Sequence, residues 1–221
     1  MSSKSIFAAL SFSVGCLALS GAVQAAPVTF SDSTSFLNAV SVPGATVGTD
    51  TFDAFNHGGN LGTTSLNRNA GGIAYTVSSS ISTLWAGATS DGFLTTDNMT
   101  SVMSISNFSL GITSFGLNVF GSNFDSFPVT GQSMRVLVTD VMNNVFDYLL
   151  EGTTLNTYFG FIGEYELASI AVSRAGSLWP SMDNLTLASA GTPSNSVPTP
   201  MTLALIGVAL LGVAATRRRN D

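Results

Sequence analysis

The chain has 221 residues, only 9% of them charged, and its formal net charge at pH 7 is −6. Between the two terminal segments the only basic residues are Arg68, Arg135 and Arg174. An acidic domain with three scattered arginines lacks the basic patch that binds nucleic acid or anionic lipid, so we expect neither as a partner. The single cysteine, Cys16, lies near the N-terminus, which excludes a disulfide, a thiol nucleophile and a cysteine-bound metal from the domain.

Residues 1–25 have the composition of a secretory signal peptide. Lys4 supplies a positive charge, an apolar run follows from Ile6 to Leu19, and Val23-Gln24-Ala25 predicts cleavage before Ala26. Two alternatives remain open, a lipoprotein signal that ends at Cys16 and an uncleaved anchor. A signal at this end predicts that the domain after it is exported.

Residues 26–190 are predicted to form one β-rich domain. Runs rich in Val, Thr and Phe are separated by turn residues at intervals of about 8 to 15 residues, which is typical of a sandwich or barrel. A short helix is predicted at Ser33 to Val40, with Asp32 as its N-cap. The strands predicted in the first half are Val28 to Phe30, Val47 to Phe55, Ile73 to Val77, Leu84 to Gly87 and Ser101 to Ser106.

Between these strands, His57-Gly58-Gly59-Asn60-Leu61-Gly62 predicts a glycine-rich loop and Asp91-Gly92 a tight turn. The second half alternates more clearly, and Asn143-Asn144 predicts a hairpin turn. Its predicted strands are Ile112 to Phe120, Met134 to Thr139, Val145 to Leu150, Tyr158 to Gly163, Leu167 to Arg174 and Met182 to Leu187. The expected fold is all-β, an antiparallel jelly-roll-like β-sandwich with a short N-terminal helix, followed by a flexible spacer at 191–197 and a C-terminal transmembrane helix.

The last segment of the chain, 198–221, predicts that transmembrane helix. An apolar run from Met201 to Ala215 is followed by a basic cluster that would stay in the cytoplasm, so the domain would lie on the far side of the membrane. The run is at the short end of the range of about 17 to 25 residues that cross a bilayer. A buried helix of a soluble domain is the alternative.

Three features in this order resemble the PEP-CTERM sorting signal of Gram-negative bacteria: a Pro-x-Pro motif, an apolar helix and an arginine cluster. They are formed here by Val197, Pro198, Thr199 and Pro200, by the apolar run, and by Arg217, Arg218 and Arg219. The resemblance implies a transient inner-membrane anchor that an exosortase-type enzyme processes, and a destination at the cell surface or in extracellular polysaccharide and biofilm. The family has Glu in the middle of the motif, where this chain has Thr199.

The domain itself resembles the exported domains found before this signal, which are similar to carbohydrate-binding jelly rolls. Those folds often hold a structural Ca²⁺ where an early strand meets the last one, and Asp50, Asp53 and Asp183 occupy such places in the chain. Ca²⁺ takes about six to eight oxygen ligands. Asp32 is a further possible ligand, although its N-cap role accounts for it, and the alternative is that all are turn and strand-edge carboxylates.

A sugar ligand needs an exposed aromatic platform beside polar groups. Trp85, Trp179 and Tyr75 are the candidates for the platform, unless they are buried in the core. Asn60 and Asn184 are the candidates for the polar groups.

No catalytic motif is recognisable in the chain. His57 is the only histidine, and neither G-x-S-x-G nor H-E-x-x-H occurs. Glu164 and Glu166 are the pair that a glycosidase would use. We therefore expect an exported, noncatalytic surface or matrix protein, either one that binds polysaccharide or one with a plainly structural role within a biofilm, with a secreted glycan-active hydrolase as the alternative.

Overall fold

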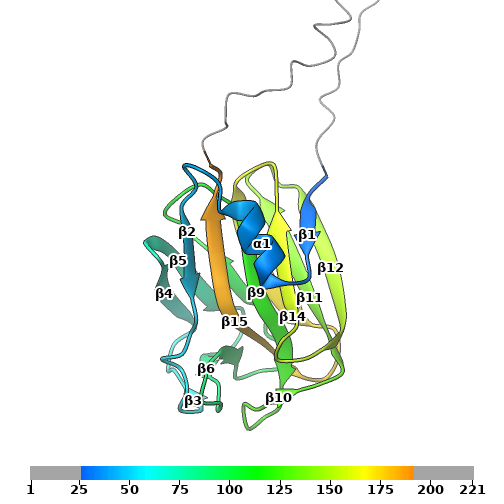
Figure 1. Ribbon diagram of the computed structural model, residues 1–221. Helices are drawn as coiled ribbons and strands as arrows, with labels where there is room; N and C mark the ends of the chain where they lie inside the picture. The colour runs from blue at the N-terminus through cyan, green and yellow to red at the C-terminus, as the bar shows by residue number, and fades with distance from the viewer. Residues whose placement is uncertain (1–25, 192–221) are drawn as a thin grey trace, which may run out of the picture.

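The structure is a computed structural model that describes residues 26–191. Two antiparallel β-sheets face each other and enclose the hydrophobic core, so the prediction of an all-β sandwich is confirmed (Figure 1). Long-range strand pairing dominates, and strands that are distant in sequence lie side by side. The order of the strands decides which side chains meet.

Over the described residues the larger sheet has nine strands. Its main path runs β1 (Val28–Phe30), β13 (Tyr158–Ile162), β9 (Ile112–Ser122), β15 (Trp179–Ser189), β7 (Leu94–Thr96), β6 (Leu84–Ala86) and β3 (Gly59–Asn60). In addition, β2 (Val47–Asp50) pairs with β15 and β10 (Pro128–Val129) pairs with β9. An early strand therefore meets the last strand, with Asp50 opposite Leu185.

The smaller sheet has six strands within residues 26–191. Its order is β12 (Val145–Thr153), β11 (Gln132–Asp140), β14 (Leu167–Arg174), β8 (Met103–Ser106), β5 (Ile73–Ser79) and β4 (Ser65–Ala70). Alternate residues of these strands are buried against the larger sheet, as Met134, Val136 and Val138 are in β11. This period of two is the signal that predicted the β11–β12 hairpin, which the structure confirms.

The helix α1 (Ser33–Val40) covers part of the outer face of the larger sheet (Figure 1). It begins as predicted, because the backbone amide of Ser35 donates to the Asp32 carboxylate at 2.8 Å. Its Phe36 packs over β13, where a Cβ on Gly160 would lie 2.9 Å from the phenyl ring. A glycine between the aromatic residues of β13 therefore gives the helix room to pack on the sheet.

Two predictions about the first half are wrong in detail. The predicted strand Val47 to Phe55 ends at Asp50, because Phe52 has a left-handed backbone with φ of 55°. The predicted glycine-rich loop contains β3, whose Gly59 and Asn60 pair with β6. Strand β4 was not predicted, since its sequence Ser65-Leu-Asn-Arg-Asn-Ala is mostly polar, as suits a strand at the edge of a sheet.

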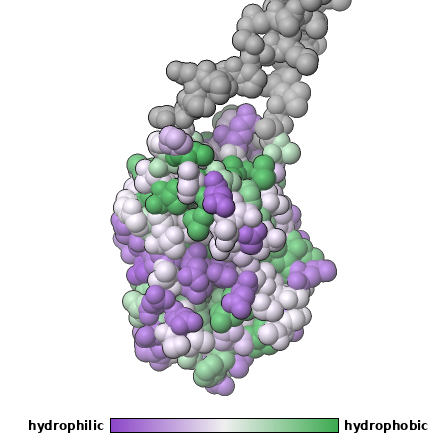
Figure 2. All heavy atoms as spheres, in the orientation of Figure 1, coloured by the Kyte–Doolittle hydropathy of each residue, from purple (hydrophilic) through white to green (hydrophobic). Residues whose placement is uncertain are grey.

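The two ends of the described chain lie at one end of the sandwich, and β3, β6 and β10 lie at the other (Figure 1). Between them, hydrophilic side chains gather across the middle of the face that carries α1 and β15 (Figure 2). No helix within residues 26–191 is long and apolar enough to cross a membrane. The predicted signal peptide and the predicted transmembrane helix lie outside the described residues.

Candidate functional site

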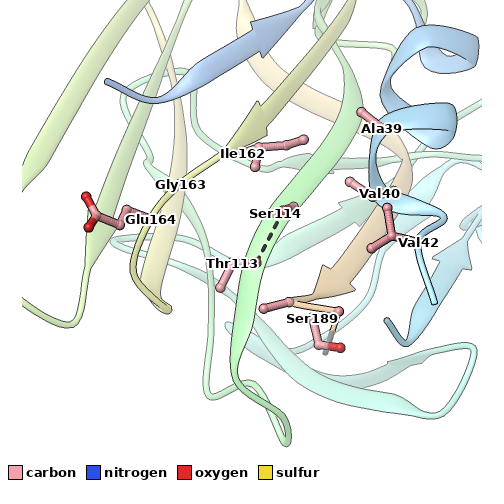
Figure 3. A pocket seen from close by; sticks show the side chains of 11 residues that line it. Ala39, Val40, Val42, Thr113, Ser114, Ile162, Gly163, Glu164 and Ser189 are labelled. Atoms are coloured by element: carbon pink, nitrogen blue, oxygen red, sulfur yellow. Dashed lines mark hydrogen bonds between the residues drawn. The ribbon is translucent and has the colours of Figure 1, made fainter. Parts of the chain in front are cut away.

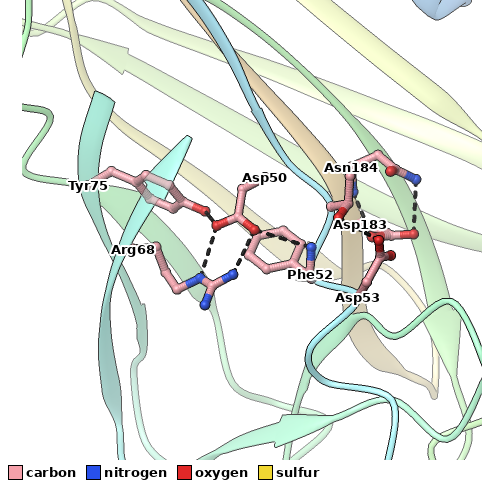
Figure 4. Close-up of polar contacts among 8 residues, drawn as sticks. Asp50, Phe52, Asp53, Arg68, Tyr75, Asp183 and Asn184 are labelled. Carbon is pink, nitrogen blue, oxygen red and sulfur yellow. Dashed lines mark hydrogen bonds and ion pairs between the residues drawn. The ribbon is translucent and has the colours of Figure 1, made fainter. Parts of the chain in front are cut away.

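Asp50 joins the two sheets at the end of β2. Arg68 of β4 donates two hydrogen bonds to the Asp50 carboxylate, from Nη2 to Oδ1 at 2.7 Å and from Nε to Oδ2 at 2.9 Å (Figure 4). The Tyr75 hydroxyl donates to Oδ2 at 2.7 Å, and the Phe52 amide donates to Oδ1 at 3.2 Å. Each carboxylate oxygen thus accepts two hydrogen bonds, which is the arrangement that a buried charge requires.

Aromatic rings complete this cluster. The Arg68 guanidinium lies 5.5 Å from the centroid of the Phe52 ring and 4.8 Å from that of Phe55, within reach of cation–π attraction. Tyr75 is buried, and burial is the main cause that raises its pKa far above the usual range. The predicted role of Tyr75 as a sugar platform is therefore wrong, because its ring belongs to the core.

Asp53 and Asp183 do not join the Asp50 cluster but line a separate depression, which we call the acidic hollow. Its volume is about 270 Å³. Its lining is almost entirely polar and consists of Thr51, Asp53, Asp91, Asn118, Leu155, Asn156, Asp183 and Asn184. Figure 4 shows Asp183 and Asp53 close together and turned away from the Asp50 ion pair. The hollow contains side-chain oxygens and no basic group among its lining residues.

A bulge in β15 shapes the acidic hollow. The pairing of β15 with β9 shifts between Asp183 and Thr186, and Asn184 has φ of 51°. Asn184 then donates to Asp183 through its backbone amide at 2.7 Å and its side-chain amide at 3.0 Å. Burial, and after it the nearby carboxylates of Asp53 and Asp91, raises the pKa of Asp183 to about 7.

The predicted calcium ligands do not form one set. Asp50 is fully engaged by Arg68 and Tyr75, whereas Asp53 and Asp183 face the acidic hollow. Asp32 serves as the helix N-cap. Within residues 26–191, no three or more His, Cys, Asp or Glu side chains are grouped so that they would hold a metal ion. Asp50 is therefore not part of the predicted calcium site, whereas the other predicted pair, Asp53 and Asp183, lies together at the acidic hollow.

The two tryptophans that the sequence singled out meet in a second place, which we call the aromatic hollow. Its lining consists of Trp85, Thr96, Asp97, Asn123, Phe124, Ser126 and Trp179. Both indole rings are half-buried, while Phe124 is 77% exposed. The Phe124 and Trp179 rings meet edge to face, with centroids 6.1 Å apart and planes at 67°. Asp97 and Asn123 add polar groups to the rim.

Four neighbouring strands of the larger sheet bring these residues together. Trp85 is on β6, Thr96 ends β7, Trp179 begins β15, and Asn123 follows β9, and these strands are consecutive in the sheet. Close to the aromatic hollow, buried hydroxyl groups form hydrogen bonds that connect β7, β9 and β15. The Thr95 hydroxyl donates to the Pro180 carbonyl at 3.0 Å and lies 3.1 Å from the Ser122 hydroxyl, which also accepts from Ser181 at 2.9 Å.

Backbone hydrogen bonds hold the loop that carries Phe124. The Asn123 side chain accepts from the Phe127 amide at 2.9 Å, and the Asn123 amide donates to the Phe127 carbonyl at 2.9 Å. The Ser126 carbonyl accepts from Ala88, which ties the loop to the segment after β6. The exposed phenyl ring of Phe124 is thus carried by a turn that these hydrogen bonds hold in place.

The other predicted ligand-binding residues fall in different places. Asn60 pairs with Trp85 in the β3–β6 ladder, but its side chain accepts from the Gly62 amide at 2.7 Å and does not line the aromatic hollow. Asn184 lines the acidic hollow instead. Phe124 was not predicted as a ligand-binding residue, although two phenylalanines in the polar run Ser122-Asn-Phe-Asp-Ser-Phe127 are a signal of exposed aromatic rings.

A third hollow, of about 220 Å³, lies beside α1 at the end where the described chain begins and stops (Figure 3). Ala39, Val40, Thr113, Ser114 and Glu164 are among its lining residues. Glu164 belongs to it and Glu166 does not, although the two were the pair predicted for a hydrolase. Both carboxylates are exposed in the turn between β13 and β14.

The residues of the predicted sorting signal, Val197 to Pro200 and Arg217 to Arg219, lie outside the described residues. The fold and the hollows therefore carry the evidence about function. No family model, curated protein or solved structure matches this chain.

Proposed function

We propose that this chain is an exported, noncatalytic protein of the cell surface or extracellular matrix that binds polysaccharide through the aromatic hollow. The observation that carries the proposal is the meeting of Trp85, Trp179 and the exposed Phe124 beside Asp97 and Asn123. A sugar ring offers C–H groups to aromatic rings and hydroxyls to carboxylate and amide groups. The lining of the aromatic hollow supplies both kinds of partner.

The position of the aromatic hollow supports the same proposal. The hollow lies near β6 and the start of β15, at the end of the sandwich opposite the two ends of the described chain (Figure 1). In the proposed topology a spacer at 191–197 and a PEP-CTERM-like signal at 198–221 follow the domain, and the signal anchors the chain transiently in the inner membrane. The aromatic hollow would then face away from the membrane and toward extracellular polysaccharide.

The proposal includes a jelly-roll-like arrangement of the sandwich. Its support is that successive strands change sheets repeatedly: β8 is in the smaller sheet, β9 in the larger, β11 in the smaller and β13 in the larger. Such crossings are typical of sandwiches in which loops from both sheets gather at each end. Sites at the loop ends of these folds have a rigid scaffold beneath them.

A glycan-binding screen of the full-length chain, purified in mild detergent, tests the proposed binding function. We expect binding to at least one polysaccharide, and a loss of about fivefold to tenfold in affinity for Phe124→Ala, which removes an exposed ring worth roughly 1 kcal/mol or more. Met142→Ala is the matched control, because Met142 is 61% exposed in the β11–β12 turn, away from the aromatic hollow. Release of reducing sugar from the bound glycan would contradict the noncatalytic part and favour the hydrolase.

Mass spectrometry of the cell-surface form tests the proposed sorting. Processing by an exosortase-type enzyme predicts that no peptide is found beyond the Val197–Pro200 region. A mature surface form that retains Arg217, Arg218 and Arg219 would contradict processing.

A further inference from the structure

We infer that the aromatic hollow recognises a primary ammonium group, so that the polysaccharide it takes contains amino sugars with free, unacetylated amines. This inference rests on the proposed function and narrows its ligand. Two observations carry it: the charge of the residues that line the aromatic hollow, and the kind of aromatic rings that border it.

The charged group among the residues that line the aromatic hollow is a carboxylate. Asp97 is exposed at its rim, and within residues 26–191 its carboxylate has no hydrogen bond or ion pair with another side chain. Asp125, next to Phe124, is exposed as well. No lysine, arginine or histidine lines the hollow. A polysaccharide rich in uronate or sulfate would meet repulsion here, whereas a cation would be attracted.

The aromatic rings also favour a positively charged ligand. Two indole rings and one phenyl ring border the space, and aromatic faces attract ammonium groups, tryptophan most strongly. The edge-to-face contact of Phe124 with Trp179 leaves the two rings at a steep angle to each other, 67°, which forms a corner instead of a flat platform. A carboxylate beside such a corner is suited to a small organic cation.

Binding of the full-length chain to a matched series of oligosaccharides tests this inference. The series consists of a β-linked glucosamine oligomer, its fully N-acetylated counterpart and a glucose oligomer of the same linkage and length. We expect the free amine to bind about twofold to fivefold more tightly than the acetylated form, the factor that one partly exposed cation–π or ion-pair contact supplies. Asp97→Asn should bring the ratio of these two affinities close to one.

Glu151→Gln is the matched control for net charge, because Glu151 is exposed on β12 of the other sheet and its substitution removes the same single charge. We expect it to leave the affinity ratio as in the natural chain. An equal drop in both variants would mean that general attraction decides, and would overturn the inference.

Failure of the inference can be separated from failure of the proposed function. Equal binding of the glucose, acetylated and free-amine oligomers overturns the ammonium site and leaves polysaccharide binding in place. Binding to none of the oligomers and to no polysaccharide of the wider screen overturns the proposed function itself.

Discussion

Asp50 shows how single residues stabilise this fold. Its carboxylate is 7% exposed and accepts hydrogen bonds from Arg68, Tyr75 and the Phe52 amide. A buried charge of this kind is tolerated because each oxygen has two donors, and removal of the cationic donor leaves the other charge unpaired. We therefore expect a large loss in the free energy of unfolding when a substitution breaks the ion pair of Asp50 with Arg68.

Loss of the Arg68 side chain should be costly. We expect Arg68→Ala to lower the free energy of unfolding by about 3 kcal/mol, since Asp50 would stay buried without its counter-ion. Arg135→Ala is the control, because its ion pair with Asp147 is exposed, with side-chain exposures of 55% and 46%, and should contribute less than about 1 kcal/mol. Urea denaturation of the two variants measures the difference, and equal losses would contradict the role of the Asp50 cluster.

We expect Asp183 to make the stability of the fold depend on pH. Its folded pKa of about 7 lies above the ordinary value of 3.8, so the folded state binds more protons than the unfolded state between these two values. Stability should therefore fall as pH rises from about 4 to about 7, and stay low above that range.

Asp183→Asn tests this dependence. The variant should be more stable than the natural chain at pH 8 by roughly 1 to 3 kcal/mol, after allowance for a lost hydrogen bond from Asn184, and should gain nothing at pH 4. Thermal unfolding across this pH range measures the effect. An unchanged pH profile in the variant would show that Asp183 ionises normally.

Among the structural elements, one close contact between the two sheets depends on a glycine. A Cβ on Gly48 of β2 would lie 2.6 Å from the Ala70 carbonyl carbon and 2.8 Å from the Gly71 Cα, which are backbone atoms that cannot turn aside. β2 belongs to the larger sheet, and Ala70 ends β4 in the smaller one. The glycine thus permits the approach that places Asp50 within reach of Arg68.

Gly48→Ala should consequently destabilise the fold by about 1 to 3 kcal/mol or more, as overpacking against backbone does. Gly176→Ala is the control, since its Cβ would meet only the end of the flexible Gln132 side chain at 3.2 Å, and should change stability by less than about 0.5 kcal/mol. Chemical denaturation measures the free energy of unfolding of both variants. Equal stability of the two variants would contradict the close approach of the two sheets at Gly48.

The sequence predicted those elements whose pattern is local. Alternation along β11 and β12 predicted their hairpin, and the Asp32 cap predicted α1 with its observed ends. β4 was not predicted, because an edge strand with mostly polar side chains lacks the regular alternation of apolar residues that indicates a strand. The early end of β2 was not predicted either, since only the left-handed backbone of Phe52 stops a run that otherwise reads as a strand.

The candidate site was predictable only in part, because its residues meet through strand order. Trp85 and Trp179 were named from composition, but nothing local shows that β6 and β15 lie two strands apart in one sheet. The ion pair of Arg68 with Asp50 depends on contact between two sheets, which the sequence pattern does not record. Because Asp50 pairs with Arg68 at this contact, its carboxylate is not part of the predicted calcium site.

At the scale of the whole molecule, the sandwich separates its chain ends from its aromatic hollow. The described chain begins and stops at one end, and Trp85 and Trp179 line a hollow near the other (Figure 1). This arrangement suits a domain that is held at one end and binds with the other. The acidic hollow lies on the larger sheet, where burial of Asp183 raises the pKa of its carboxyl group.

Binding of polysaccharide through the aromatic hollow is tested by the affinity of the full-length chain measured beside that of Phe124→Ala and Met142→Ala. We expect the natural chain and Met142→Ala to bind alike, and Phe124→Ala to bind about fivefold to tenfold more weakly with unchanged stability. Equal binding by all three proteins would show that the aromatic hollow is not the binding surface.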